Sequence, residues 1–410
     1  MVTSTESRTK FADLLTHRSE LRAQVENVVN SMAVTDVHTH LFPLEFNELC
    51  LYGIDELLTY HYLTAETLRS ARIPHDRFWQ MSKMDQADLV WQTLFVENSP
   101  ASEAARGIVT VLDAFGLDTR AENLAEARAF FNSRRLSEHI DHVFDIARVS
   151  GVVMTNDPFD ETEGQIWKSD DFGADPRFKS ALRLDRLLNT NLVTGTITDL
   201  RHSLDEWIAR MNPVYMGVSL PADFRFPADN TRDRLLRDVV LPTAKEHGLA
   251  MTLMVGVRRG VNPLLREAGD GVGRADVTSV ERLCGEYQDV NFLATFLSRE
   301  NQHELCVAAR KFNNLMPFGC WWFLNNPSIV SEITRERLEL LGMSFIPQHS
   351  DARVLEQLIY KWKHAREEIA AALADSYELL LSSGRAVTAE EITRDVNRLF
   401  SGNFGDWIQR

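Results

Sequence analysis

The chain lacks the features that mark secreted, membrane-spanning and nucleic-acid-binding proteins. Residues 1–10 are polar and contain no apolar signal-peptide core, and no apolar run in the 410 residues approaches the length of a membrane span. Positive charge is in deficit, with a formal net charge of −15, whereas nucleic acids are bound by clustered Lys and Arg. We therefore expect a cytoplasmic protein with no membrane or nucleic-acid partner. A small anionic substrate still fits this charge, because local arginines and a metal act at shorter range than the distant surface.

Cysteine is scarce, and its spacing is uninformative. Only Cys50, Cys284, Cys306 and Cys320 occur, and none belongs to a CxxC pair. Structural zinc sites and redox motifs commonly use such pairs. Since these cysteines lie mostly in apolar surroundings, we predict reduced, packed thiols without a disulfide or metal role.

Short apolar runs recur between segments of helical periodicity, and their number predicts the fold. We count eight such runs, at residues 34–38, 151–155, 181–184, 214–218, 251–255, 291–295, 315–321 and 343–347. Apolar strands that alternate with helices form parallel βαβ units. Eight of them predict an α/β protein with a (β/α)8, TIM-like barrel.

The interval between the first two runs is too long for one crossover. Residues 43–150 contain several helix-period segments, so we predict a mostly helical insertion after the first strand. A further helix is expected within residues 8–31, and the capping-box spacing of Thr388 and Glu391 predicts closing helices. We find no repeat or low-complexity linker, so residues 1–410 are expected to form a single barrel domain.

Two histidines stand two residues apart at the end of the first run, in the segment TDVHTHLF. Because residues i and i+2 of a strand point to one face, His38 and His40 would project together. Two neutral imidazoles that converge suit a divalent metal, most commonly zinc. The alternative for an isolated HxH is a hydrogen-bonded core pair.

Polar residues gather at the predicted C-terminal strand ends, where barrels of this type carry their chemistry. They are Asn156, Asp157, Arg183, Asp185, Ser298, Arg299, Trp321, Trp322, His349, Asp351 and Arg353. The first and eighth strands are neighbours in a closed barrel, so Asp351 would lie beside His38 and His40 and complete a metal site with open positions. The alternatives for Asp351 are a salt bridge with Arg353 and a helix cap.

Five segments together resemble the uronate isomerases, an outlying branch of the amidohydrolase superfamily. They are TDVHTHLF, MTNDPF, LRLD, FGCWWFLNNP and QHSDARVLEQLIYKW. The likeness covers essentially the whole chain in the right order, which is far more specific than HxH alone. It implies reversible conversion of D-glucuronate to D-fructuronate and of D-galacturonate to D-tagaturonate. The sequence neither ranks these hexuronates nor gives the oligomeric state, so a homo-oligomer stays open.

The resemblance also implies roles for individual residues. The metal ligands carry over onto His38, His40 and Asp351, and the family's insertion supplies a histidine and a tyrosine that match His61 and Tyr62. Residues that match the substrate-binding arginines and the tryptophans near the sugar are Arg183, Arg353, Trp321 and Trp322. We add Arg299 as a substrate-binding candidate, although it could instead cap the next helix.

Aldose–ketose isomerisation gives these residue types definite tasks. The C2 proton must move to C1 through an enediol, and one base can serve both carbons. We expect Asp351 to be that base and Arg353 to stabilise the enediolate oxygens. His61 and Tyr62 are expected to open the sugar ring, and Arg183 to bind the substrate carboxylate together with the metal.

One metal is expected rather than two. Binuclear members of the superfamily need a bridging lysine or carboxylate on the fourth strand and histidines on the fifth and sixth. This sequence offers Val218, Met254 and Ser298 in those regions. We expect Zn²⁺, and Mn²⁺ also fits an open, oxygen-rich site.

Several alternatives stay open. His61 could be a core histidine, and Arg183 could pair with Asp185 or Asp157. At most one of Trp321 and Trp322 would face the pocket, because neighbours in a strand point to opposite sides. The alternative function is a mononuclear metal-dependent hydrolase or decarboxylase of the same superfamily, and a third is a non-catalytic barrel that binds sugar acids.

Overall fold

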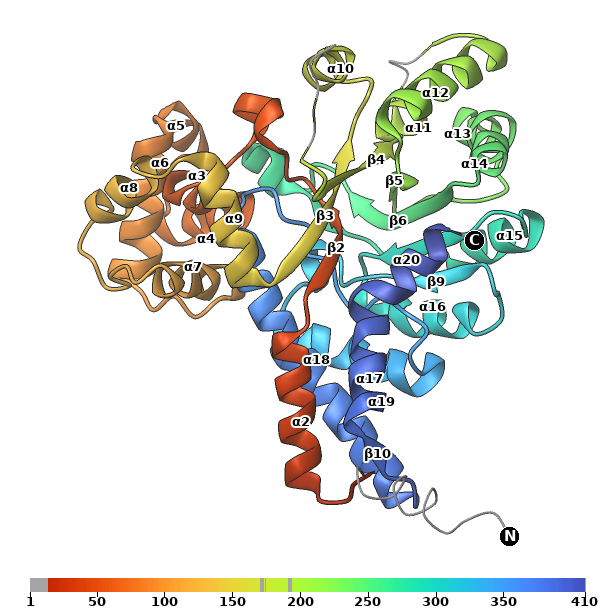
Figure 1. Ribbon diagram of the computed structural model, residues 1–410. Coiled ribbons are helices and arrows are strands. Elements are labelled where there is room, and N and C mark those ends of the chain that lie inside the picture. Colours follow the sequence, from red (N-terminus) through yellow and green to blue (C-terminus); the bar gives the residue numbers. More distant parts are fainter. Residues whose placement is uncertain (1–13, 170–172, 174, 191–193, 410) are drawn as a thin grey trace.

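A curled sheet of seven parallel strands forms the centre of the molecule (Figure 1). The computed structural model describes residues 14–169, 173, 175–190 and 194–409. In sheet order the strands are β2 (Val34–Thr39), β3 (Val149–Asn156), β4 (Phe178–Arg183), β5 (Tyr215–Pro221), β6 (Ala250–Arg258), β8 (Phe292–Phe296) and β9 (Leu315–Pro317). Each pairs in parallel with its neighbours. The mixed α/β architecture with a TIM-like barrel is therefore confirmed.

An extended segment without a regular strand fills the eighth position of the barrel. Ile346 forms a parallel bridge with Phe318, just beyond β9. Five residues later, the Asp351 N–H donates to the His38 carbonyl of β2 at 3.2 Å. The segment therefore lies between β9 and β2 and brings the two ends of the sheet together.

The last two predicted strands were too regular. The predicted strand 343–347 contains one bridged residue, because residues 343–345 form the turn and bend that follow the helix Pro327–Leu341, and Pro347 has no N–H to donate to a ladder. The predicted strand 315–321 ends at Pro317. Both C-terminal strand ends are thus loops, which frees their side chains from strict alternation.

Side chains from around the barrel fill its interior. The cluster includes Val37, Val153, Ala181, Tyr215, Met254, Leu293, Met316 and Ile346, all buried. These residues come from all seven strands and from the closing segment, as expected for a barrel packed in layers. The interior is therefore a core, and the site must lie at its rim.

Helices pack around the outside of the barrel. They are α10 (Glu161–Lys168), α11 (Asp185–Asn189), α12 (Ile197–Met211), α13 (Thr231–Leu235), α14 (Leu241–His247), α15 (Val277–Glu286), α16 (Gln302–Ala309) and α17 (Pro327–Leu341). The short strand β7 (Gly271–Val272) pairs antiparallel with β6. The cysteines, as predicted, are all free and buried.

A helical lobe lies between β2 and β3 in the chain and to one side of the barrel (Figure 1). Its helices are α3 (Ile54–Leu58), α4 (His61–Ala71), α5 (His75–Gln80), α6 (Lys83–Trp91), α7 (Glu103–Ala114), α8 (Ala125–Asn132) and α9 (Leu136–Ala147). Gly107 lets α7 pack closely against the Tyr360 ring, because a Cβ at position 107 would lie 2.6 Å from that ring. The division of 1–410 into one domain with an insertion at 43–150 stays a prediction.

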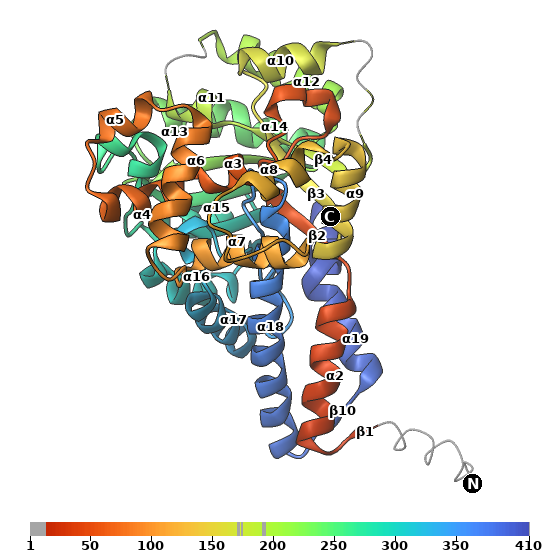
Figure 2. The ribbon, with the colours of Figure 1, turned by 90° about the vertical axis from the view of Figure 1, so that its left-hand side faces the viewer.

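The terminal helices project together away from the barrel (Figure 2). They are α2 (Arg18–Ser31), α18 (Gln357–Ser382) and α19 (Ala389–Asn397), joined by the short pair β1 (Leu14–Leu15) and β10 (Val387–Thr388). The last helix, α20 (Asn403–Ile408), instead lies against the barrel and packs Phe404 and Trp407 on its interior cluster (Figure 1). The predicted capping box of Thr388 and Glu391 is present. Residues 8–13 of the predicted first helix lie outside the described residues. Among the helices described, none combines the length and the apolar character needed to cross a membrane.

Candidate active site

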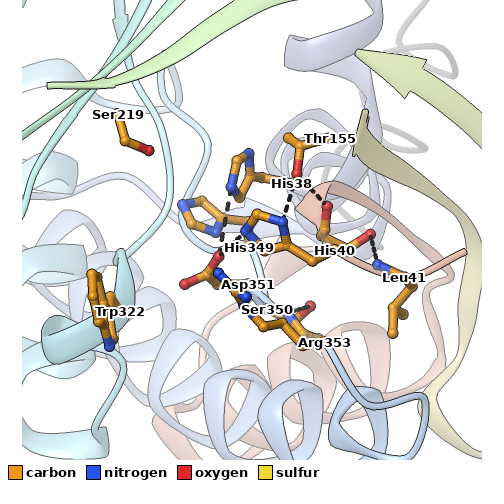
Figure 3. Close-up of polar contacts among 12 residues, drawn as sticks. His38, His40, Leu41, Thr155, Ser219, Trp322, His349, Ser350, Asp351 and Arg353 are labelled. Carbon is orange, nitrogen blue, oxygen red and sulfur yellow. Dashed lines mark hydrogen bonds and ion pairs between the residues drawn. The ribbon is translucent and has the colours of Figure 1, made fainter. Parts of the chain in front are cut away.

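His38, His40 and Asp351 converge at the rim of the barrel (Figure 3). Asp351 Oδ1 lies 3.5 Å from His38 Nε2 and 3.4 Å from His40 Nε2. Ligand atoms bonded to zinc at tetrahedral angles lie about 3.3–3.5 Å apart. The nitrogen and oxygen donors and their spacing therefore fit one divalent metal ion.

The two imidazoles are buried and neutral. Burial lowers the pKa of His38 to about 3, against the opposing effect of Asp351. Burial, reinforced by Arg353, holds the pKa of His40 well below its ordinary value. Both rings are therefore in the form that can bind a metal. Their Nδ1 atoms face hydroxyl groups, from Tyr215 at 3.2 Å and Thr155 at 2.9 Å.

The backbone holds Asp351 in a left-handed conformation, with φ +53°. Asp36 fixes Ser350, the residue before Asp351, because its two buried carboxylate oxygens accept the Ser350 N–H at 3.1 and 3.2 Å. The same carboxylate accepts the Trp362 indole N–H at 2.8 Å. Burial raises the pKa of Asp36 to about 6, although these hydrogen bonds oppose the shift. The strained conformation at Asp351 is thus held both from β2 and within the loop, where the Ser350 hydroxyl accepts the Ala352 N–H at 3.1 Å.

Arg183, at the end of β4, lines the same cavity as His38 and His40. It also borders an adjoining cavity of about 520 Å³. Its Nε lies 3.1 Å from Asp185 Oδ2. Arg183 therefore pairs with Asp185 and lines the cavity at the same time. The two interpretations from the sequence, an ion pair with Asp185 and a substrate-binding side chain, do not exclude each other.

Arg353 borders a further cavity, of about 390 Å³, together with Tyr60 and His61. Among the described residues, its guanidinium has neither an ion-pair partner nor a hydrogen-bond acceptor; only its backbone N–H is bonded, to Gln357. The salt bridge with Asp351 that the sequence left open is therefore not formed. A guanidinium held at a cavity in this way is ready to bind an anion.

His61 and Tyr62 begin α4, on the helical lobe. The indole N–H of Trp322 donates to His61 Nε2 at 3.1 Å. Burial, followed by Arg353, lowers the pKa of His61 to about 3. Burial also raises the pKa of Tyr62 well above its usual value. Both side chains are therefore neutral near pH 7, and because His61 Nε2 accepts the Trp322 N–H, the proton of the His61 ring lies on Nδ1.

Trp321 and Trp322 have different surroundings. Trp321 is 3% exposed and packs in the barrel interior, whereas Trp322 turns toward His61 from a residue with φ +48°. The structure thus places Trp322 beside His61, which borders the cavity, and leaves Trp321 in the core.

Glu356 joins the helical lobe to the loop that carries Asp351 and Arg353. Its Oε1 lies 2.7 Å from His139 Nε2 and accepts the Gly53 N–H at 2.9 Å. Both side chains of the Glu356–His139 pair are fully buried. Together with the backbone hydrogen bond from the Leu355 N–H to the Leu51 carbonyl, this joint ties the half of the site on the lobe to the half on the barrel.

Two strand-end residues from the sequence analysis do not join the cluster. Arg299 is exposed and pairs with Glu332 of α17, so its role in substrate binding rests on the sequence alone. His349 is fully buried, with its ring 5.1 Å from that of His38. Gly319 makes room for it, because a Cβ at this φ +65° position would lie 1.9 Å from the imidazole.

Four residues that shape the site were not predicted. Asp36 shares strand parity with His38 and His40, so the TDVHTH segment did contain a signal for it. Tyr215, Thr155 and Glu356 carry no such signal, because their partners are distant in the chain.

The fold is similar to that of known isomerases. The crystal structure of a uronate isomerase from Bacillus halodurans C-125 shares 50% identity and a TM-score of 0.93, over 96% of this chain and 97% of that one. A uronate isomerase from Thermotoga maritima has a TM-score of 0.72 over 95% and 97% of the two chains. A glucuronate isomerase from Caulobacter crescentus has a TM-score of 0.73 over 96% and 94%. The last two are 14% identical to this chain and show a common fold only. No protein-family model and no curated protein matches the sequence.

Proposed function

Because this chain belongs to the uronate isomerase family, we propose that it interconverts D-glucuronate with D-fructuronate and D-galacturonate with D-tagaturonate by moving a proton between C2 and C1. It is an isomerase that acts on hexuronates. The alternative of a hydrolase or decarboxylase is not favoured by its relatives.

The free guanidinium of Arg353 is the observation that carries the proposed mechanism. Arg353 follows Asp351 by two residues and borders the cavity that His61 also lines. Asp351 removes the C2 proton, and the electron pair of that bond forms the enediolate while the C1 carbonyl becomes an oxyanion. Arg353 stabilises this developing charge. A proton then passes from the C2 hydroxyl to the C1 oxyanion, Asp351 returns its proton to C1, and the carbonyl forms at C2.

Ring opening precedes this transfer, and we assign it to His61 and Tyr62. Opening a hexuronate ring requires a proton to leave the anomeric hydroxyl and another to reach the ring oxygen. His61 Nε2 accepts the first proton in place of the Trp322 N–H, and the phenol of Tyr62 supplies the second. The imidazolium then returns its proton to the Tyr62 phenolate, whose ring lies 4.4 Å from that of His61 between centroids, and both groups are neutral again. The neutral forms of both side chains at pH 7 support this division of work.

Arg183 would bind the C6 carboxylate. Its position between two cavities supports this role, and the planar fork of the guanidinium suits a carboxylate. Asp185 orients the Arg183 side chain by holding its Nε edge. Trp322 would pack against the sugar beside His61.

His38, His40 and Asp351 would hold the metal, which we propose to be Zn²⁺, with Mn²⁺ as the second choice. When bound, the metal supplies a positive charge that polarises substrate oxygen atoms. Elemental analysis should give one metal ion per chain. A His38→Ala, His40→Ala double variant should lose it, and two ions per chain or full retention by the double variant would contradict the assignment.

Proton exchange tests the function directly. The purified chain is incubated in D₂O with D-glucuronate or D-galacturonate, and NMR follows the carbonyl products. An isomerase places deuterium on C1 of the ketose and, after reversal, on C2 of the aldose. Loss of CO₂ or bond hydrolysis without such labelling would support the alternative, and binding without any exchange would indicate a non-catalytic barrel.

A further inference from the structure

The ring nitrogens of His38 and His40 that face away from Asp351 are both held by hydroxyl groups. His38 Nδ1 contacts the Tyr215 hydroxyl of β5, and His40 Nδ1 contacts the Thr155 hydroxyl of β3 (Figure 3 shows the latter). A hydroxyl has one proton to donate and can also accept. The destination of that single proton decides which tautomer each histidine adopts.

Both hydroxyl protons are used on backbone carbonyls of β2. Tyr215 donates to the Val37 carbonyl at 2.9 Å, and Thr155 donates to the Thr39 carbonyl at 2.9 Å. The register of β2 against β3 shifts within this stretch, between Asp36 and Thr39. Buried carbonyls need a donor, so the hydroxyls keep this donation. Toward the imidazoles they can then only accept.

We propose that Tyr215 and Thr155 are positioning residues that keep His38 and His40 in the tautomer with the proton on Nδ1. Both Nε2 lone pairs then point at the Asp351 carboxylate, 3.5 and 3.4 Å away. Two lone pairs and a carboxylate that face one another without a proton between them repel, and a divalent cation relieves that repulsion. The inference rests on the metal site proposed above.

His38 and His40 are held by the same pattern of hydrogen bonds, although the two hydroxyl groups come from different residue types. One hydroxyl is a phenol that spans the barrel interior from β5, and the other is a threonine on the adjacent strand β3. Each hydroxyl donates one hydrogen bond to a backbone carbonyl of β2 and accepts one from an imidazole N–H. If the hydroxyls served only to satisfy the carbonyls, their removal would lower stability and leave the affinity for the metal unchanged.

A measurement of metal affinity therefore shows whether the two hydroxyls position the histidines or only stabilise the backbone of β2. The full chain is stripped of metal and titrated with Zn²⁺ in competition with a chromophoric chelator. Tyr215→Phe and Thr155→Val should each bind Zn²⁺ about 10- to 100-fold more weakly. Thr155→Ser keeps the hydroxyl and should bind like the parent. Tyr377→Phe is the matched control, because it removes a buried hydroxyl that donates to Asp395, outside the site.

Spectra of protein labelled with ¹⁵N-histidine give a second measurement. In the parent, Zn²⁺ should shift two Nε2 resonances while their Nδ1 atoms stay protonated, and Tyr215→Phe should disturb one of these pairs. Parental affinity in both Tyr215→Phe and Thr155→Val would overturn the positioning role and leave the metal site standing. Absence of Zn²⁺ binding by the parent would overturn both, whereas the deuterium-exchange experiment judges the isomerase function separately. Thermal unfolding of the metal-free variants checks that each is folded.

Discussion

The two halves of the site are held in place by different kinds of contact. In the barrel half, β2 and the closing segment are joined by backbone hydrogen bonds: the Asp351 N–H donates to the His38 carbonyl, and the His40 N–H donates to the Ala352 carbonyl at 2.7 Å. In the lobe half, His61 reaches the barrel through side chains, above all the indole of Trp322.

Because of this difference, substitutions in the barrel half should change the reactive groups, whereas substitutions in the lobe half should change the position of the side chains. Backbone hydrogen bonds survive most side-chain substitutions, so a variant in the barrel half can lose its reactive group and keep its geometry. The lobe half also has a backbone link, because the Leu355 N–H donates to the Leu51 carbonyl at 2.9 Å. The position of His61 itself depends on side-chain contacts, so a substitution at such a contact can displace His61 and Tyr62 from the substrate. Substitutions in each half of the site test this contrast.

Asp351→Asn should have the largest effect on turnover. Asparagine also tolerates a left-handed backbone, so φ +53° can be kept. The amide fills the same space but cannot accept a proton, and loss of a general base costs about 100- to 10,000-fold in rate. Steady-state kinetics should show this fall in kcat with a much smaller change in KM. Turnover within a few-fold of the parent, with C2 exchange retained, would move the base to His61 or Tyr62.

Arg183→Met should weaken the use of uronates by about ten- to a few hundred-fold, since hydrogen bonds to charged groups contribute roughly 1.5–3 kcal/mol. Residual activity on an aldohexose without the carboxylate should change little. Arg135→Met is the matched control and should stay within about twofold, because it loses only an exposed ion pair with Glu138. An equal loss on both substrates would make Arg183 a support of the barrel instead.

Glu356→Ala should loosen the joint between the halves. It leaves the Gly53 N–H and the His139 ring without their acceptor, and each buried group left unpaired costs about 1–3 kcal/mol. Chemical denaturation should show a fall of about 2–6 kcal/mol in the free energy of unfolding, and kcat should fall by about tenfold, less than the ~100-fold that a 1 Å misplacement can cost. Glu332→Ala is the surface control.

A double-variant cycle shows whether Glu356 acts through the lobe. In a His61→Asn background, Glu356→Ala should reduce kcat much less than in the parent, because the group it positions is already absent. Fully additive losses would mean that the joint acts on Asp351 or Arg353 instead.

Trp322→Phe should have the smallest effect. It removes one neutral hydrogen bond to His61, worth about 0.5–1.5 kcal/mol, and so should lower kcat about two- to tenfold. Trp321→Phe is the control, since that ring packs in the barrel interior and its change should appear in stability rather than in kcat. A larger loss in kcat for Trp321→Phe would reverse the assignment of the two rings.

The residues of the candidate site that could be predicted share a local cause. His38 lies in β2 and His40 directly follows its last residue, Thr39, so the two-residue spacing predicted one face although the register of β2 shifts in this stretch. Asp351 follows from barrel closure, because the first and last positions must meet. Arg299 shows the limit of this reasoning: it follows a strand as Arg183 does, yet the short helix after β8 leads it outward to Glu332.

The sequence by itself determined the parallel barrel, the helical lobe between the first two strands and the pairing of HxH with Asp351, because apolar periodicity and strand alternation act over a few residues. Only the tertiary structure decided the rest. The left-handed backbone at Asp351 depends on Asp36, which is distant in the chain. The hydroxyls behind the imidazoles come from β3 and β5, and the lobe is held by Glu356 and Trp322. Such contacts join residues more than a hundred positions apart, and no local pattern encodes which of them will meet.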